Sequence, residues 1–160
     1  MSIYAISDLH LSFNTNKPMD IFGWENYEER IKKNWLEKVN EKDLVLLPGD
    51  FSWEMKLENT YKDFEFINNL PGKKLLLKGN HDLWWTTLKK MRTFLEEENL
   101  KNIDFIYNNS YEFENYIIAG TRGWNLISEG EEDKKIKERG ICICAEKYLW
   151  KRFPTEDFMN

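Results

Sequence analysis

One pattern recurs three times in the first half of the chain and limits the folds open to it. A short apolar run, at residues 3–6, 43–47 and 73–78, is followed by a loop rich in Asp, Asn, His and Gly, and then by apolar residues at helical spacing. This order is typical of βαβ units, whose right-handed crossovers make the strands parallel. The sequence therefore predicts an α/β fold, with the three polar loops at one edge of a parallel sheet.

Three helices are expected between and after these strands. In each helix the apolar residues recur every three or four positions, which places them on one face toward the sheet. Pro71-Gly72 is expected to end the second helix. The residues expected to face the core are Ile31, Trp35 and Val39 in the first helix, Leu57, Tyr61, Phe64 and Ile67 in the second, and Leu88, Met91 and Leu95 in the third.

The pattern changes near residue 102, where a second sheet is expected to begin. Residues 103–121 read as strands, with "NNS" as the expected hairpin turn, and the later "ICIC" predicts one further short strand. Only two strands of this sheet are clear. They leave apolar residues, including Ile117 and Ile118, without full cover, so self-association or poor solubility is expected unless the tail from Gly140 onward packs over that surface.

Composition limits the class of protein. The chain has 160 residues, 41% of them hydrophobic, which is enough for a single domain over residues 1–160. It lacks a secretion signal and a membrane-spanning run, so a cytoplasmic protein with no membrane partner is expected. A net charge of −5 argues against bulk nucleic-acid binding. Cys142 and Cys144 share one face of a predicted strand, and we interpret them as packing residues.

Side chains that can bind metal follow each of the three predicted strands, in "SDLH", "PGD" and "GNHD". Asp8 and His10 lie two residues apart, so on an extended backbone both side chains point the same way and can chelate one ion. Asp50 adds a second carboxylate, and the preceding Gly49 allows a sharp turn. Asn80 offers a neutral amide oxygen that completes a metal shell without adding charge.

The third loop also supplies candidates for proton transfer. His81 is placed to act as a proton donor over the ions, and Asp82 is placed to orient its imidazole and favour the charged form. Each of the three motifs alone is common in loops that have no chemistry. The chain contains only two histidines, however, and both fall within these motifs. Their joint placement favours a catalytic metal site.

The set of motifs resembles the calcineurin-like metallophosphoesterases, over residues 3–124. The resemblance implies an α/β/β/α sandwich, a two-metal centre, and hydrolysis of a phosphate mono- or diester by a metal-activated water. The mixed carboxylate, amide and imidazole ligands suit manganese, iron or zinc. It implies metal-ligand roles for Asp8, His10, Asp50 and Asn80, with Asp50 bridging the ions, and a role for His81 at the phosphate and leaving group, with Asp82 behind it.

One part of the family pattern is missing. The family also takes histidine ligands from its second half, whereas this chain has no histidine after His81. Three ligands would then serve one ion and two the other, so one or two ions are expected, and activity is expected to be weak. The fold is expected to be incomplete at the C-terminus, with an atypical tail over residues 125–160. A truncated member, a reduced one-ion member and a non-catalytic module that binds metal or a partner remain open.

The substrate is expected to be a small phosphoester. Substrate contacts are assigned to Asn80, His81 and Arg122, since Arg122 lies where a predicted strand ends and its guanidinium can bind phosphate. Several tryptophans lie in or near the predicted site loops, where a nucleobase or another flat group would stack. Core packing is the favoured alternative for them. These tryptophans are Trp24, Trp53, Trp84, Trp85 and Trp124.

Overall fold

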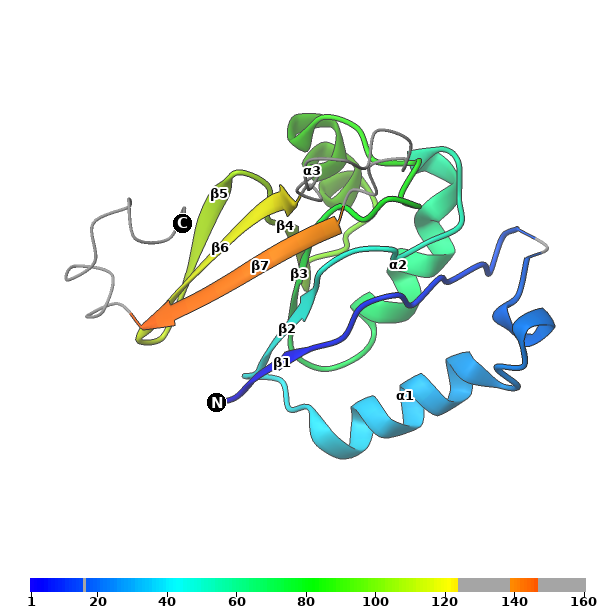
Figure 1. Ribbon diagram of the computed structural model, residues 1–160, viewed down its shortest axis with the longest axis horizontal. Coiled ribbons are helices and arrows are strands. Elements are labelled where there is room, and N and C mark those ends of the chain that lie inside the picture. Colours follow the sequence, from blue (N-terminus) through cyan, green and yellow to red (C-terminus); the bar gives the residue numbers. More distant parts are fainter. Residues whose placement is uncertain (16, 124–138, 147–160) are drawn as a thin grey trace, which may run out of the picture.

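The computed structural model describes residues 1–15, 17–123 and 139–146. A four-stranded sheet is formed by β1 (Ile3–Ala5), β2 (Leu44–Leu47), β3 (Lys73–Leu76) and β4 (Ile103–Phe105), which lie side by side in chain order (Figure 1). All three pairings within it are parallel. The expected parallel arrangement of the first three strands is confirmed. The fourth strand was expected in the second sheet, but it joins this one because Ile103 and Phe105 pack into the core under the helices.

The helices cover one face of this sheet. They are α1 (Tyr27–Lys38), α2 (Tyr61–Asn68) and α3 (Leu88–Glu97), with short 3-10 helices η1 (Met19–Phe22) and η2 (Leu57–Thr60) before the first two. Thr87 begins α3, because its side chain accepts a hydrogen bond from the Lys90 N–H. The expected apolar faces are confirmed except at Tyr61: Trp35, Val39, Phe64, Ile67, Met91 and Leu95 are buried in one core, and Ile31, Leu57 and Leu88 pack against it half-buried. The Tyr61 hydroxyl instead donates to the Glu65 carboxylate in an exposed hydrogen bond.

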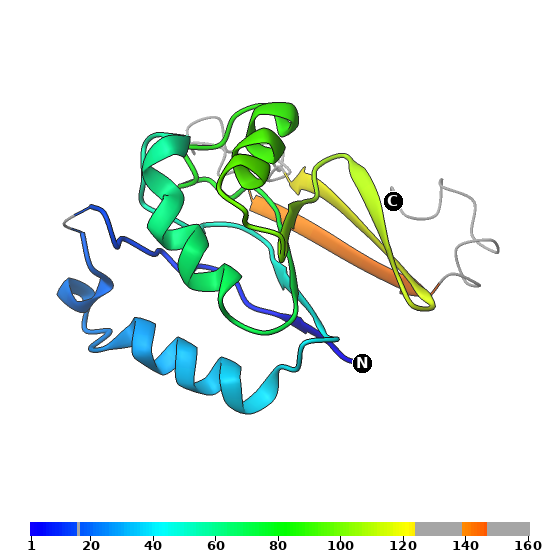
Figure 2. The same ribbon diagram turned by 180° about the vertical axis from the view of Figure 1, so that it is seen from behind.

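A second, antiparallel sheet lies on the opposite face of the first, as Figures 1 and 2 show. It consists of β5 (Asn109–Phe113), β6 (Tyr116–Gly123) and β7 (Arg139–Glu146) in that order. The hairpin turn between β5 and β6 falls at residues 114–115, so the turn predicted at "NNS" is wrong. The sheet also has three strands instead of two clear ones, because residues 139–146 pair along the whole of β6.

Apolar side chains fill the space between the two sheets. Ile118 is 0% exposed, which corrects the expectation that it lacks cover, and Ile117 is half-buried. Gly120 lets the sheets approach closely, because a Cβ there would lie 2.8 Å from Ile106. This second core is made of Leu44, Leu46, Leu75, Leu77, Ile106 and Ile118. The layers are thus helices, parallel sheet and antiparallel sheet, as expected for the first three layers of an α/β/β/α sandwich.

The positions of the two cysteines agree with the expectation. Cys142 and Cys144 lie two residues apart in β7, opposite Gly120 and Ile118 of β6, so their backbone positions share one face as expected.

Within the described part of the chain, no helix has both the length and the apolar character needed to cross a membrane.

Candidate metal centre

The predicted polar loops meet at one edge of the parallel sheet, beyond the carboxyl ends of β1, β2 and β3. The first two loops continue to pair after their strands end. The Asp8 N–H donates to the Gly49 carbonyl at 3.1 Å, and the His10 N–H donates to the Asp50 carbonyl at 3.0 Å. Backbone hydrogen bonds therefore fix Asp8 and His10 beside Asp50, although these residues are far apart in sequence.

Three side chains converge at this edge. Asp8, His10 and Asp50 each offer a ligand atom, and these atoms all lie within 4.8 Å of one another. The His10 Nε2 is 3.9 Å from Asp8 Oδ1 and 4.0 Å from Asp50 Oδ2. Both distances are too long for a hydrogen bond. They leave the space that a cation needs between a nitrogen and two carboxylate oxygens.

The backbone of all three residues is left-handed. Asp8, His10 and Asp50 have φ values of 60°, 46° and 52°. This corrects the expectation that Asp8 and His10 chelate from an extended strand, because the side chains converge through tight left-handed turns. Such a conformation costs roughly 1–2 kcal/mol for a residue other than glycine, and it persists where surrounding structure enforces it. Here the hydrogen bonds between the two loops do so.

Each carboxylate is oriented through one of its oxygens. The Ser7 hydroxyl donates to Asp8 Oδ2, and the His81 backbone N–H donates to Asp50 Oδ1 at 2.8 Å. The other oxygen of each carboxylate faces the His10 Nε2. The arrangement presents one oxygen from each aspartate to the shared space.

The state of His10 suits a metal ligand. Burial lowers the pKa of His10, and the charges of Asp50 and Asp8 oppose this while those of His81 and Lys17 add to it. A lowered pKa favours the neutral imidazole, the form that binds metal. Its Nδ1 is buried and has no hydrogen-bond partner among the described residues, so no such contact competes for the ring's orientation. Two carboxylates and an imidazole fit a divalent ion such as manganese, iron or zinc.

The third loop places Asn80 and His81 beside this cluster. Both residues are exposed, and the bond from the His81 N–H to Asp50 holds the loop in place. The His81 ring lies 5.6 Å from the His10 ring and 4.9 Å from the Trp53 ring, measured between centroids. The imidazole is thus at the rim of the cluster and open to solvent. The ligand role of Asn80 stays a prediction.

Asp82 has a different role from the expected one. Its carboxylate is 0% exposed and accepts N–H hydrogen bonds from the backbone of Gly79, Asp50, Phe51 and Ser52 and from the Trp84 ring. None of these donors is the His81 imidazole. Asp82 therefore ties the loop after β3 to the loop after β2. Burial raises the pKa of Asp82 to about 6, against the lowering effect of the backbone hydrogen bonds.

A second buried carboxylate holds the site loops from the helix side. Asp63 in α2 accepts a hydrogen bond from the Ser52 hydroxyl and one from the Phe13 N–H at 3.0 Å. Burial raises the pKa of Asp63 to about 6, and these hydrogen bonds partly oppose it. Sequence reasoning missed Asp63 because a single acidic residue in an amphipathic helix gives no sign of burial.

The tryptophans divide between packing and the site. Trp84 is 2% exposed among Phe51, Phe64 and Phe105, so packing is the correct interpretation for it. Trp53 instead stacks on His10, with ring centroids 4.5 Å apart and planes at 21°. Arg122 lies in β6, but its side chain is outside the described structure, as is all of Trp124.

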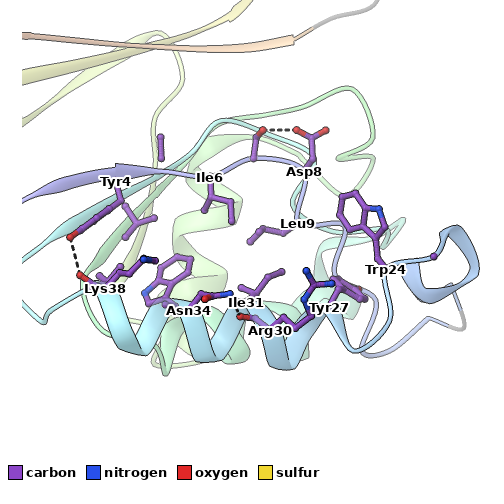
Figure 3. A pocket seen from close by; sticks show the side chains of 16 residues that line it. Tyr4, Ile6, Asp8, Leu9, Trp24, Tyr27, Arg30, Ile31, Asn34 and Lys38 are labelled. Carbon is purple, nitrogen blue, oxygen red and sulfur yellow. Dashed lines mark hydrogen bonds between the residues drawn. The ribbon is translucent and has the colours of Figure 1, made fainter.

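A mostly apolar cavity of about 600 Å³ lies between β1 and α1 (Figure 3). Asp8 lines it, whereas His10 and Asp50 do not, so the cavity adjoins the metal centre without containing it. Trp24, which is 44% exposed, also lines this cavity. Its apolar and aromatic lining includes Tyr4, Ile6, Leu9, Tyr27, Ile31 and Trp35, and Arg30 and Lys38 also line it.

Comparison with known proteins establishes the relationship. The model of the calcineurin-like phosphoesterase family matches residues 1–152. The chain belongs to the calcineurin-like phosphoesterase family. The match extends past the 3–124 range of the sequence motifs into the tail. The metal-competent cluster described above is therefore part of a metallophosphoesterase fold.

This member of the calcineurin-like phosphoesterase family is also similar to one solved structure. It is the crystal structure of the protein of unknown function AQ665 from Aquifex aeolicus, with 23% sequence identity and a TM-score of 0.46. The similarity covers 73% of this chain, and the chain spans 58% of that protein. No curated protein matches the chain.

Proposed function

We propose that the protein hydrolyses a phosphate mono- or diester with the help of a bound divalent metal ion. The observation that carries the proposal is the convergence of Asp8, His10 and Asp50, with the exposed His81 beside them, in a chain of this family. The coarse function, a metal-dependent phosphoesterase, rests on the family and the donor set together.

We assign the roles of the residues from the family resemblance, and the placement of Asp8, His10, Asp50 and His81 supports the assignment. Asp8, His10 and Asp50 would hold one ion, and Asp50 and Asn80 would hold a second. A bound divalent ion supplies a Lewis acid for phosphoryl oxygens and lowers the pKa of a bound water. His81 is exposed, so its imidazole can reach the substrate and give a proton to the leaving oxygen. Its backbone bond to Asp50 keeps that imidazole near the ligands.

The supply of ligands makes the two ions unequal. Three side chains serve the first ion, and three protein ligands suffice for a catalytic site with an open position. Only Asp50 and Asn80 serve the second, and Asp50 Oδ1 already accepts the His81 N–H. We therefore expect tight binding of one ion, with the second much weaker.

Replacing Asp50 by alanine tests the function directly. The variant should lose bound manganese or zinc and, with it, hydrolysis of bis(p-nitrophenyl) phosphate, because it removes a ligand common to both ions. Metal content is measured by elemental analysis, and turnover by absorbance. Glu96→Ala, at an exposed carboxylate of α3, is the matched control and should keep both. Metal retained by Asp50→Ala would contradict the ligand assignment. If the parent chain binds metal but shows no turnover, the protein is a non-catalytic metal-binding module instead of an enzyme.

His81→Ala should lower kcat by about 100-fold and keep the metal, because a positioned acid contributes roughly 10²- to 10⁴-fold. The loss should shrink for esters with better leaving groups, which need less protonation. Rates are compared across a series of substituted phenyl phosphates, with metal content measured on the same samples. Equal losses of metal and of rate would instead make His81 a ligand.

A further inference from the structure

Lys17 is held at the rim of the metal centre by an aromatic ring. Its Nζ lies 3.6 Å from the centroid of the Trp53 ring, within the range of a cation–π interaction. Trp53 in turn stacks on His10 and meets His81 edge to face. The backbone N–H of Trp53 donates to the Leu11 carbonyl at 3.0 Å, which fixes the residue to the loop that carries His10. One indole therefore contacts the ammonium and both histidines.

The ammonium does not pair with the carboxylates of the cluster. Its charge acts on His10, yet among the described residues no ion pair within 4.0 Å joins Lys17 to Asp8 or Asp50, whose carboxylates face His10 instead. A lysine that served to neutralise Asp8 or Asp50 would bond to them. An indole face takes no N–H of the ammonium in a conventional hydrogen bond, so its three donors stay available to an anion.

We infer that Lys17, positioned by Trp53, binds a non-bridging oxygen of the substrate's phosphoryl group and makes the site favour phosphate monoesters over diesters. The inference rests on the proposed hydrolysis, because it assigns Lys17 to the same site. A monoester carries a dianionic phosphoryl group and a diester a monoanionic one. Coulomb attraction scales with the product of the charges, so an added cation strengthens monoester binding more.

Binding of inorganic phosphate to the manganese-loaded chain provides the first test, measured by isothermal titration. Lys17→Met should raise the Kd for phosphate about tenfold, since a hydrogen bond to a charged group contributes on this scale. Lys17→Arg should stay near the parent value, because it keeps the charge and the stacking on the ring. Lys89→Met, at an exposed lysine of α3, is the control and should not change the Kd.

Kinetics provide the second test. Lys17→Met should raise KM for p-nitrophenyl phosphate about tenfold. KM for bis(p-nitrophenyl) phosphate should change much less, and kcat should stay near the parent value for both esters. A parent-like Kd in Lys17→Met, equal losses in Lys17→Met and Lys17→Arg, or no phosphate binding by the parent would each overturn the inference. Phosphate binding that depends on Lys17 in a chain without turnover would support the anion site and refute the hydrolysis.

A double-mutant cycle tests the part played by Trp53. With manganese saturating and its content confirmed, Trp53→Leu should weaken phosphate binding in the parent and have little further effect in Lys17→Met. That result is expected if the indole acts by holding the ammonium. Independent, additive losses would show that Trp53 acts by another route and overturn its positioning role.

Discussion

Replacing Asp82 by alanine should destabilise the protein by about 5 kcal/mol, because it leaves several buried N–H groups without an acceptor at roughly 1–3 kcal/mol each. Four of these groups belong to the backbone of the site loops, and the fifth is the Trp84 ring N–H. Whole domains of this kind have only about 5–15 kcal/mol of stability. We expect the variant to be largely unfolded, or folded with disordered site loops. Urea unfolding followed by tryptophan fluorescence measures the change.

Asp43 provides a matched control for Asp82. It is also a buried carboxylate that accepts backbone N–H hydrogen bonds, from Ser2 and Asn40, but it lies before β2 and away from the metal centre. Asp43→Ala should lower stability and leave manganese affinity unchanged in the folded protein, whereas Asp82→Ala should lower both. If Asp82→Ala kept its stability and its metal and lost only kcat, Asp82 would act through His81 after all.

The topology of the first sheet could be predicted because its signals are local. Each strand is a run of apolar residues, each helix has its apolar face at regular spacing, and the right-handed crossover fixes the strand direction. Once the strands are parallel, Asp8, Asp50 and His81 must meet at one edge. The approximate position of the site therefore followed from residue types and spacing, without knowledge of a single contact.

The parts that were missed depend on contacts between distant residues. Asp82 lies next to His81 in sequence, but in the folded chain its carboxylate accepts hydrogen bonds from the N–H groups of a loop 30 to 32 residues away. The left-handed turns at Asp8 and His10 follow from the pairing of that same loop. The sequence around Trp53 favoured a packing role, because nothing in it shows that His10 and Lys17 contact the Trp53 ring.

The hairpin of the second sheet was misplaced for a related reason. Both "NNS" and the Glu114-Asn115 pair are suitable for a turn, so local sequence does not choose between them. The choice depends on which strands find partners. With the turn at residues 114–115, Tyr111 pairs with Ile118 and the core between the sheets closes. Ile106 is then free to continue the pairing of β4 with β3, and its N–H donates to the Leu76 carbonyl at 2.9 Å.

Glycine residues bring the second and third site loops into contact. A Cβ on Gly79 would lie less than 3.0 Å from the backbone nitrogen and the carboxylate of Asp50, and a Cβ on Gly49 would lie 2.7 Å from the Gly79 Cα. The Gly79 N–H also donates to Asp82 at 2.8 Å. The position of the Asp50 carboxylate therefore depends on the absence of a side chain at Gly79.

Gly79→Ala should cost about 3 kcal/mol of stability and lower manganese affinity more than tenfold, because the added methyl clashes with the backbone and carboxylate of Asp50 and displaces them. Gly79 has no positive φ, so this substitution tests the steric clash without added backbone strain. Gly23→Ala is the complementary control: Gly23 has φ +84° and open space around it, so it should cost about 1 kcal/mol through backbone strain and leave metal binding intact. Urea unfolding and metal titration measure both variants. Equal effects of the two substitutions, or unchanged metal affinity in Gly79→Ala, would show that Asp50 does not owe its position to this contact.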